Sequence, residues 1–479
     1  MTAPTLRHPF AWGLWACALG AGLLLFLIWY PGIITADGWF QWREAISGRI
    51  TNWHPVWVTM VITMILKVAP GLSPNSQLGI EFLAQSMTIY LSSCLFVLSI
   101  SDNRSTRWIM MVAFVLYYPL WFALALVYKD AWFFGFLLLT LAFFFRYTRS
   151  GSWGDVLGIA VAAGLTILNR HTAGLSLILL SPVLLLIIRD EPFGGSWRTH
   201  AKPIAAVIVG WIIAAVVTKL VLVVKIANFA NLILLFDVFG IVSRSSAPIE
   251  SFAHLKTYQE VGHKAFFQGL SGLAYNGMSD YLIFSPDSIY PPDRVLATKN
   301  ALWDLASLSR TNPGEWIEFK VLMLMQMLGI SRYDFLYTSS FWNAAGSPFT
   351  AHPLLPGVKA ALMERMVPGL VSTSLLYKIK LWNWPIYHYI PLTASLILNS
   401  VMLMCPRRLS PYQKSSLALL WAGMSCLIPF LLLSPGGTFR YMMASNVLWW
   451  LSVLLALMAL SQSLRKNLKP AEQVGHPGK

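Results

Sequence analysis

Apolar stretches recur along almost the whole chain and are separated by short polar segments. Most are roughly 15 to 24 residues long, and about 20 apolar residues allow a helix to cross the hydrocarbon core of a bilayer. The pattern therefore predicts an all-α polytopic membrane protein with about ten transmembrane helices. The predicted spans are Phe10–Tyr30, Gln77–Ile100, Trp108–Val127, Trp132–Tyr147, Asp155–Leu168, Ala173–Ile188, Pro203–Ile226, Pro385–Met404, Ser415–Leu433 and Tyr441–Ser461.

A shorter apolar stretch, Pro55–Ala69, decides on which side of the membrane every later loop lies. If it crosses, Arg104, Arg107 and the next basic clusters fall outside. If it lies in the membrane interface, the short loops that are rich in basic residues all share one side, which the positive-inside rule identifies as the cytoplasm. We therefore predict an interfacial helix at 55–69 within a first outer loop, 31–76, and cytoplasmic positions for both termini.

This topology divides the chain into four parts. Residues 1–226 form an N-terminal transmembrane module, 227–384 an outer loop region, 385–462 the C-terminal transmembrane helices and 463–479 a cytoplasmic tail. The outer region carries most of the acidic residues and turn signals such as Asn312-Pro313-Gly314. It is predicted to be partly helical and to lie over the helix bundle.

Composition agrees with a membrane protein, because 56% of the residues are hydrophobic and only 11% are charged. The net charge of +15 sits mainly in short loops, which is typical of membrane topology and anionic lipid contact rather than of a nucleic-acid groove. The four cysteines have no metal-ligand spacing. The sequence also lacks P-loop, GxSxG and zinc signatures. The first apolar stretch is too long for a signal-peptide core, so we expect it to be retained.

The first candidate residues for chemistry lie between Tyr30 and Trp57. Asp37 could act as a general base or bind a divalent ion, or it could simply form a turn with Gly38. Trp39 and Trp42 offer flat faces for stacking, although an interface belt is the alternative. His54 could orient a substrate hydroxyl or cap the interfacial helix ahead of Pro55.

Three further polar motifs fall on the same predicted side. Lys129-Asp130 lies between two apolar stretches, where it is either functional or an interfacial anchor. Arg170-His171 is a candidate phosphate-binding motif, because a guanidinium binds phosphate oxygens in a forked geometry; a snorkelling arginine is the alternative. Arg440-Tyr441 follows a glycine-rich segment that suits either ligand contact or a plain hairpin turn.

The order of these motifs resembles the GT-C superfamily of integral-membrane glycosyltransferases, which includes protein O-mannosyltransferases and lipid A aminoarabinose transferases. The matching segments are Ala36-Asp37-Gly38, Trp53-His54-Pro55, Lys129-Asp130, Arg170-His171 and Arg440-Tyr441. The resemblance covers the first half of the chain, and the second half only through the last pair. The sequence lacks the Glu that adjoins the first acidic residue in the mannosyltransferases, and its His-Pro segment has one proline, so no single family is indicated.

The resemblance implies that a sugar moves from a polyprenyl-phosphate-linked donor to a glycan, lipid or protein acceptor on the outer face of the membrane, in a bacterial inner membrane. It implies catalytic roles for Asp37 and Asp130. It implies substrate binding by Lys129, Arg170, His171, Arg440, Tyr441, His54, Trp39 and Trp42. Lys129 and the two arginines would hold the phosphate. A divalent ion shared by Asp37 and Asp130 fits the pattern but is not required, and the sequence names no cofactor.

Other functions remain open at the level of sequence. A transporter or lipid-linked glycan flippase would favour related halves and ionisable residues at mid-membrane depth, for which Lys219 is the best evidence. A surface-polysaccharide polymerase or ligase would use the same class of donor. A non-catalytic assembly protein would have no reason to gather Asp37, Lys129, Asp130, Arg170 and Arg440 on one side.

Overall fold

The computed structural model describes residues 9–34, 36–51, 54–116, 126–127, 129–170, 172–188, 197–222, 229–261, 298–328, 389–404, 409–433 and 443–468. These residues are almost entirely helical, which confirms the predicted all-α class. The elements of the first half are α1 (Pro9–Trp29), β1 (Ile33–Ile34), α2 (Ala36–Ser47), α3 (Val56–Val68), α4 (Pro74–Ile100), α5 (Arg104–Leu116), β2 (Leu126–Val127), α7 (Lys129–Ser150), α8 (Trp153–Asn169), α9 (Ala173–Ile188) and α10 (Trp197–Val221). Those of the second half are α11 (Phe229–Val242), a 3₁₀ turn (Ile249–Phe252), α12 (Lys256–Val261), α15 (Thr298–Thr311), α16 (Pro313–Met327), α20 (Tyr389–Met404), α21 (Pro411–Leu433) and α22 (Met443–Leu468).

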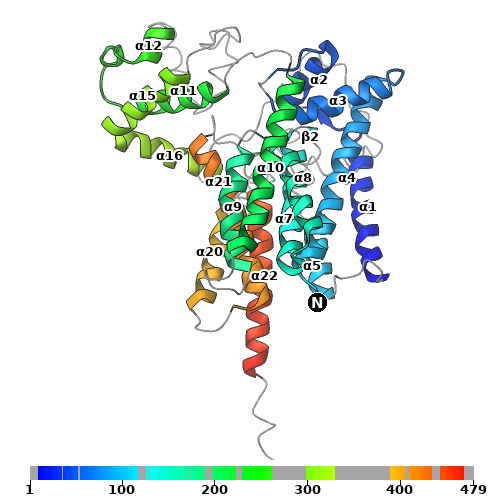
Figure 1. Ribbon diagram of the computed structural model, residues 1–479. Coiled ribbons are helices and arrows are strands. Elements are labelled where there is room, and N and C mark those ends of the chain that lie inside the picture. The colour runs from blue at the N-terminus through cyan, green and yellow to red at the C-terminus, as the bar shows by residue number, and fades with distance from the viewer. Residues whose placement is uncertain are drawn as a thin grey trace, which may run out of the picture.

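Long helices form a bundle in which α1, α4, α7, α10 and α22 are long and apolar enough to cross a membrane. Four shorter apolar helices, α3, α8, α9 and α20, accompany them. Each predicted span overlaps one of the described helices, although residues 117–125 of the predicted span Trp108–Val127 lie outside the described residues. The beginning of α1 and the end of α22 lie at the same end of this bundle (Figure 1).

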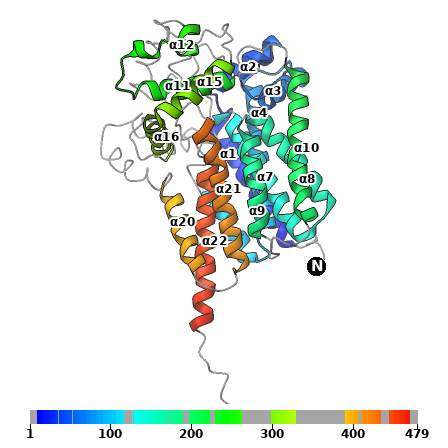
Figure 2. The ribbon, with the colours of Figure 1, turned by 60° about the vertical axis from the view of Figure 1, so that its left-hand side comes forward.

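Helices α1 and α4 are antiparallel neighbours, which decides where the first loop lies. The backbone at Gly79 of α4 approaches the ring of Tyr30, just after α1, and Gly22 of α1 approaches Met87 of α4. The chain therefore returns at Pro74 to the end of the bundle that it left at Trp29. Helices α2 and α3 cover this end without crossing the bundle (Figures 1 and 2). We call it the capped end.

A two-residue parallel pairing, which the sequence pattern does not predict, joins two distant segments at the capped end. Ile33 pairs with Leu126 and Ile34 with Val127. The strand β1 lies just before α2, and β2 lies just before α7. The first turns of α2 and α7 are therefore held side by side, although they are more than ninety residues apart in the sequence.

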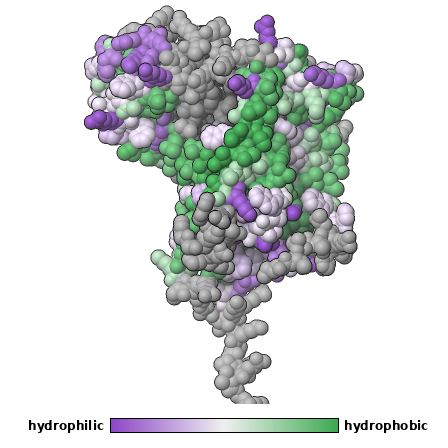
Figure 3. Space-filling view, in the orientation of Figure 1, coloured by the Kyte–Doolittle hydropathy of each residue, from purple (hydrophilic) through white to green (hydrophobic). Residues whose placement is uncertain are grey.

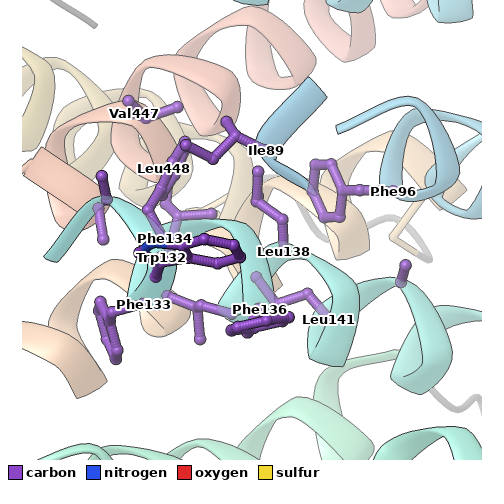
Figure 4. Packing of buried hydrophobic residues seen from close by; sticks show 14 of the residues in the cluster. Ile89, Phe96, Trp132, Phe133, Phe134, Phe136, Leu138, Leu141, Val447 and Leu448 are labelled. Carbon is purple, nitrogen blue, oxygen red and sulfur yellow. The ribbon is translucent and has the colours of Figure 1, made fainter. Parts of the chain in front are cut away.

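The helix α7 is anchored by a dense aromatic core. Figure 4 shows Trp132 and Phe134 of α7 beside Leu448 of α22, with Ile89 of α4 close by. These side chains are at most 3% exposed. This packing fixes the start of α7, where Lys129 and Asp130 lie.

The structure corrects the predicted bounds of this helix. The sequence pattern places Lys129 and Asp130 in a turn and begins the span at Trp132, whereas both residues belong to the first turn of α7. A carboxylate in the first helical turn is favoured by the helix dipole, which explains the earlier start.

The described helices of the outer region, α11, α12, α15 and α16, also lie at the capped end (Figure 1). They share a second apolar cluster that includes Phe236, Phe239 and Phe319 and is completed by Leu427 and Trp449 of the bundle. Hydrophilic side chains gather over α12 and α15, whereas apolar side chains cover α10 (Figure 3). The outer region is therefore built onto one side of the bundle, with its polar face away from it.

Candidate functional site

One face of α2 carries three polar side chains at helical spacing, Asp37, Gln41 and Glu44. Positions i, i+4 and i+7 lie on one face of an α-helix. Two of the side chains hold the segment between α2 and α3. Gln41 Nε2 donates to the carbonyl oxygen of Pro55 at 3.2 Å. Glu44 accepts hydrogen bonds from the backbone N–H of Thr51 at 3.0 Å and from the Thr51 hydroxyl.

Glu44 is itself buried, with 5% of its surface exposed. The Thr59 hydroxyl of α3 also donates to it, at 3.3 Å. Burial raises the pKa of the Glu44 carboxyl, and the hydrogen bonds from Thr51 and Thr59 oppose this shift. The Glu44 carboxyl therefore joins α2 to Thr51, which precedes His54, and to Thr59, which follows it.

The third member of the polar face, Asp37, pairs with a residue from α7. Lys129 Nζ lies 3.3 Å from Asp37 Oδ2 and 2.9 Å from His54 Nδ1. The lysine and aspartate side chains are 14% and 13% exposed, so the pair is largely but not fully enclosed. The β1–β2 pairing explains the meeting, because it sets the first turn of α2 beside the first turn of α7.

The next residue of α7 makes a separate ion pair. Asp130 Oδ1 lies 3.0 Å from Arg170 Nη1, and these side chains are only 1% and 6% exposed. Arg170 caps the C-terminus of α8, and its guanidinium lies 5.1 Å from the ring centre of Phe133. Consecutive helix positions point about 100° apart, so Lys129 and Asp130 reach different partners. The result is two adjacent ion pairs built from α2, α7 and α8.

The opposite side of α2 fixes the helix to the bundle. Trp42 is 1% exposed, and its Nε1 donates to Glu81 Oε2 of α4 at 3.0 Å. Glu81 is fully buried. The Trp42 ring packs into the core, whereas Trp39 is half-buried.

The structure thus brings Asp37, His54 and Lys129 into direct contact and places Asp130 and Arg170 next to them. His171, Arg440 and Tyr441 lie outside the described residues. The sequence interpretation missed the roles of Gln41 and Glu44. The spacing of 37, 41 and 44 would have revealed them if the segment 36–47 had been interpreted as a helix rather than as a polar loop.

Each of the two carboxylates has a side-chain cation as its partner in this arrangement. Within the described ranges, no group of three His, Cys, Asp or Glu side chains could hold an ion. Asp37 has Lys129 as its partner, and Asp130 has Arg170. A cation shared by the two carboxylates would have to compete with both side-chain cations. The arrangement is instead suited to binding an anion and orienting a nucleophile beside it.

The comparisons with known proteins give one weak likeness. No family model matches the sequence, and no curated protein matches it. A crystal structure of the Archaeoglobus fulgidus oligosaccharyltransferase, tethered to an acceptor peptide with an NVT sequon, matches with a TM-score of 0.39 and 12% identity. The match covers 96% of this chain and 51% of that one, so the chain spans about half the length of the archaeal enzyme. Neither a family nor an activity follows from a likeness of this size.

Proposed function

We propose that this protein is a membrane glycosyltransferase that moves a sugar from a polyprenyl-phosphate-linked donor to a glycan, lipid or protein acceptor. The observation that carries the proposal is the position of Lys129, whose ammonium contacts both Asp37 and His54 at the capped end of an apolar helix bundle. A cation, a carboxylate and an imidazole meet there at the end of helices that are apolar enough to lie in lipid. A donor with a lipid tail and a negatively charged phosphate group is complementary to this combination of an apolar bundle and a cation.

The proposed reaction breaks the bond between the sugar C1 and the phosphate oxygen and forms a bond from C1 to the acceptor nucleophile. Asp37 orients that nucleophile and takes its proton. Lys129 stabilises the negative charge that develops on the leaving polyprenyl phosphate. Asp130 holds the guanidinium of Arg170 beside this centre, from which Arg170 adds positive charge to the donor side.

The proposal includes the topology that the positive-inside rule predicts. The capped end lies on the outer face of a bacterial inner membrane, and both termini lie in the cytoplasm. The segment 1–226 supplies the catalytic module. The region 227–384 forms an outer cap over the bundle, and 385–462 completes the bundle. The position of α2, α3 and the described helices of the outer region at one end of the bundle supports this division (Figure 1).

The experiment is an assay of the purified full-length protein with radiolabelled polyprenyl-phosphate sugars and membrane extracts as acceptor. We expect release of polyprenyl phosphate by the parent protein and its loss in Asp37→Asn. Asp102→Asn is the matched control, because Asp102 is 74% exposed and follows α4 at the other end of the bundle. Equal transfer by the parent protein and Asp37→Asn would overturn the catalytic assignment.

Glu81 favours one alternative, a transporter or lipid-linked glycan flippase. A fully buried carboxyl inside a membrane helix is a frequent feature of transport pathways. Its hydrogen bond from Trp42 instead ties it to the support of α2. Uptake of a labelled lipid-linked glycan into proteoliposomes that persists in Asp37→Asn would favour transport over transfer.

A further inference from the structure

Glu81 is a buried carboxyl of α4 that belongs to neither ion pair of the candidate site. It is 0% exposed, and α4 is long and apolar enough to cross a membrane. A carboxyl in such a position is costly and requires a specific partner. Trp42 of α2 donates to its Oε2 at 3.0 Å, whereas Oε1 has no hydrogen-bond partner among the described residues. The hydrogen bonding of Glu81 is therefore directed at α2.

The helix α4 does not need this hydrogen bond to keep its place in the bundle. Its side chains Phe82 and Ile89 are fully buried in the main apolar cluster, which also includes residues of α1 and α7. The helix α2 is different, because it has only 12 residues and a mixed polar and aromatic sequence. Helices of this length are marginal without tertiary contacts. The position of α2 therefore depends on the side chains that join it to its neighbours.

Trp42 lies on the side of α2 that is almost opposite to Asp37. The two residues are five positions apart, so their side chains point about 140° apart around the helix axis. A helix with its side chains has a radius of about 5 to 6 Å, so a rotation of α2 by about 20° moves the Asp37 carboxyl by about 2 Å. The contact between Asp37 Oδ2 and Lys129 Nζ measures 3.3 Å and is broken by a shift of that size. The rotation of α2 therefore decides whether this pair forms.

We propose that Glu81 is a positioning residue, which acts through Trp42 to set the rotation of α2 and so places Asp37 against Lys129. The β1–β2 pairing holds the chain just before α2, and Glu44 holds the segment that follows it. The hydrogen bond between Trp42 and Glu81 joins the body of α2 to a helix of the bundle. The role of Asp37 in sugar transfer rests on the proposed function, whereas its placement against Lys129 does not.

The test measures how fast individual lysines of the full-length protein are acetylated by an amine-reactive ester, with mass spectrometry of the peptides as the readout. Lys129 is protected in the parent protein, because its side chain is 14% exposed and pairs with Asp37. We expect Glu81→Met to raise the acetylation rate of Lys129 about tenfold, since one buried hydrogen bond is lost. Trp42→Phe should have the same effect. Glu81→Gln, whose amide oxygen can still accept from Trp42, should stay close to the parent protein.

Two comparisons separate positioning from a general loosening of the fold. Lys320 of the outer region is also ion-paired and 10% exposed, so its acetylation reports general loosening. Thr140→Val is the matched control variant, because it removes a buried hydrogen bond to Thr166 between α7 and α8. The control variant should leave Lys129 protected, and no variant should alter the acetylation of Lys320. The positioning role is overturned if Lys129 stays protected in Glu81→Met, or if it reacts faster only together with Lys320 or equally in the control.

The double variant Trp42→Phe/Glu81→Met separates the placement of α2 from stability. It removes the donor and the acceptor together, so no indole N–H is left unsatisfied, and its thermal stability should equal or exceed that of Glu81→Met. Its Lys129 should nevertheless be acetylated as fast as in Glu81→Met. Protection restored in the double variant would show that apolar packing sets the rotation of α2 and would overturn the role of the hydrogen bond.

The transfer assay connects the placement of Asp37 to the proposed reaction. Glu81→Met should lower kcat about 100-fold, the effect of misplacing a reacting group by about 1 Å, with little change in KM for the donor. Glu81→Gln should retain most of the parent kcat. A raised KM with an unchanged kcat would contradict the link to Asp37. The acetylation measurements need no turnover, so if the parent protein transfers no sugar but Lys129 responds as expected, the glycosyltransferase proposal fails while the positioning role stands.

Discussion

Two parts of this protein bury an ion pair between an aspartate and a lysine, and they differ in what surrounds it. In the outer region, Lys320 Nζ of α16 lies 2.7 Å from Asp237 Oδ1 of α11 and also donates to the Leu432 carbonyl oxygen of α21 at 3.3 Å. Its side chains are 10% and 3% exposed and sit in an apolar cluster. At the capped end, the Asp37–Lys129 pair adjoins His54 and a second ion pair.

The comparison separates a structural ion pair from a candidate site. The Asp237–Lys320 pair links two helices of the outer region to a backbone carbonyl oxygen of the bundle, which is a structural role. The Asp37–Lys129 pair contacts an imidazole, and the next residue of α7, Asp130, pairs with the guanidinium of Arg170. A buried aspartate-lysine pair is therefore weak evidence for function by itself, and the convergence of different chemical groups is the stronger sign.

The largest expected effect comes from breaking the structural pair. Lys320→Met should lower the free energy of unfolding by about 3 to 5 kcal/mol, because it leaves the Asp237 carboxylate buried without its cation. The double variant Asp237→Leu/Lys320→Met should recover most of this loss. Thermal unfolding of the detergent-solubilised variants measures both. A single variant as stable as the parent would show that the pair does not hold the outer region to the bundle.

At the candidate site, the expected effect is on rate rather than stability. Lys129→Gln should lower sugar transfer about 100-fold or more, since it removes the cation beside the leaving phosphate. Its unfolding should change less than that of Lys320→Met, because Lys129 is less deeply enclosed. The transfer assay and thermal unfolding are carried out on the same preparations. A loss of stability that matches Lys320→Met would place the Asp37–Lys129 pair in the structural class as well.

A smaller effect is expected at Glu44, whose hydrogen bonds join α2 to Thr51 and Thr59. Glu44→Ala removes the acceptor for the buried Thr51 N–H, and an unsatisfied buried donor costs about 1 to 3 kcal/mol. We expect Glu44→Gln, which retains one acceptor oxygen, to lose less stability and less transfer than Glu44→Ala. Glu318→Ala is the control, because Glu318 is 72% exposed. Transfer rates that are the same in both Glu44 variants and the control would show that the hydrogen bonds of Glu44 do not position His54.

A further effect is expected on the pH dependence of stability in the outer region. Burial raises the pKa of Asp237 to about 6, and the charge of Lys320 opposes the shift. A carboxyl whose pKa is raised in the folded state stabilises the fold below its unfolded pKa, and this stabilisation is lost as the pH rises through about 6. Asp237→Asn should remove this step from a plot of unfolding free energy against pH between 4 and 8. Persistence of the step in that variant would assign it to another group.

The sequence predicted the helices because apolar length is a local property. Each predicted span overlaps a described helix, and the bounds of α7 are off by three residues at its start because Lys129 and Asp130 were interpreted as a turn. The helix α2 was missed, since its residues are mixed polar and aromatic and do not form an apolar stretch. Its polar spacing of 37, 41 and 44 is nevertheless visible in the sequence once a helix is assumed.

The candidate residues were also recognisable, because charged groups beside apolar helices stand out against their surroundings. The sequence could not tell which charges pair. Lys129 and Asp130 are neighbours in the chain, yet one contacts Asp37 and the other Arg170. Either carboxylate could have met either cation in a different packing, and the β1–β2 pairing that decides the matter is only two residues long.

By itself, the sequence determined that this is a helical membrane protein, because residue type decides which stretches are apolar enough to be buried. It also showed which ionisable residues lie beside apolar helices, where burial of a charge costs free energy. Only the tertiary structure decided that Lys129 bridges Asp37 and His54 and that Asp237 and Lys320 form a structural link. Partner choice depends on helix rotation and on contacts between segments far apart in the chain, and hydrophobic periodicity carries no information about either.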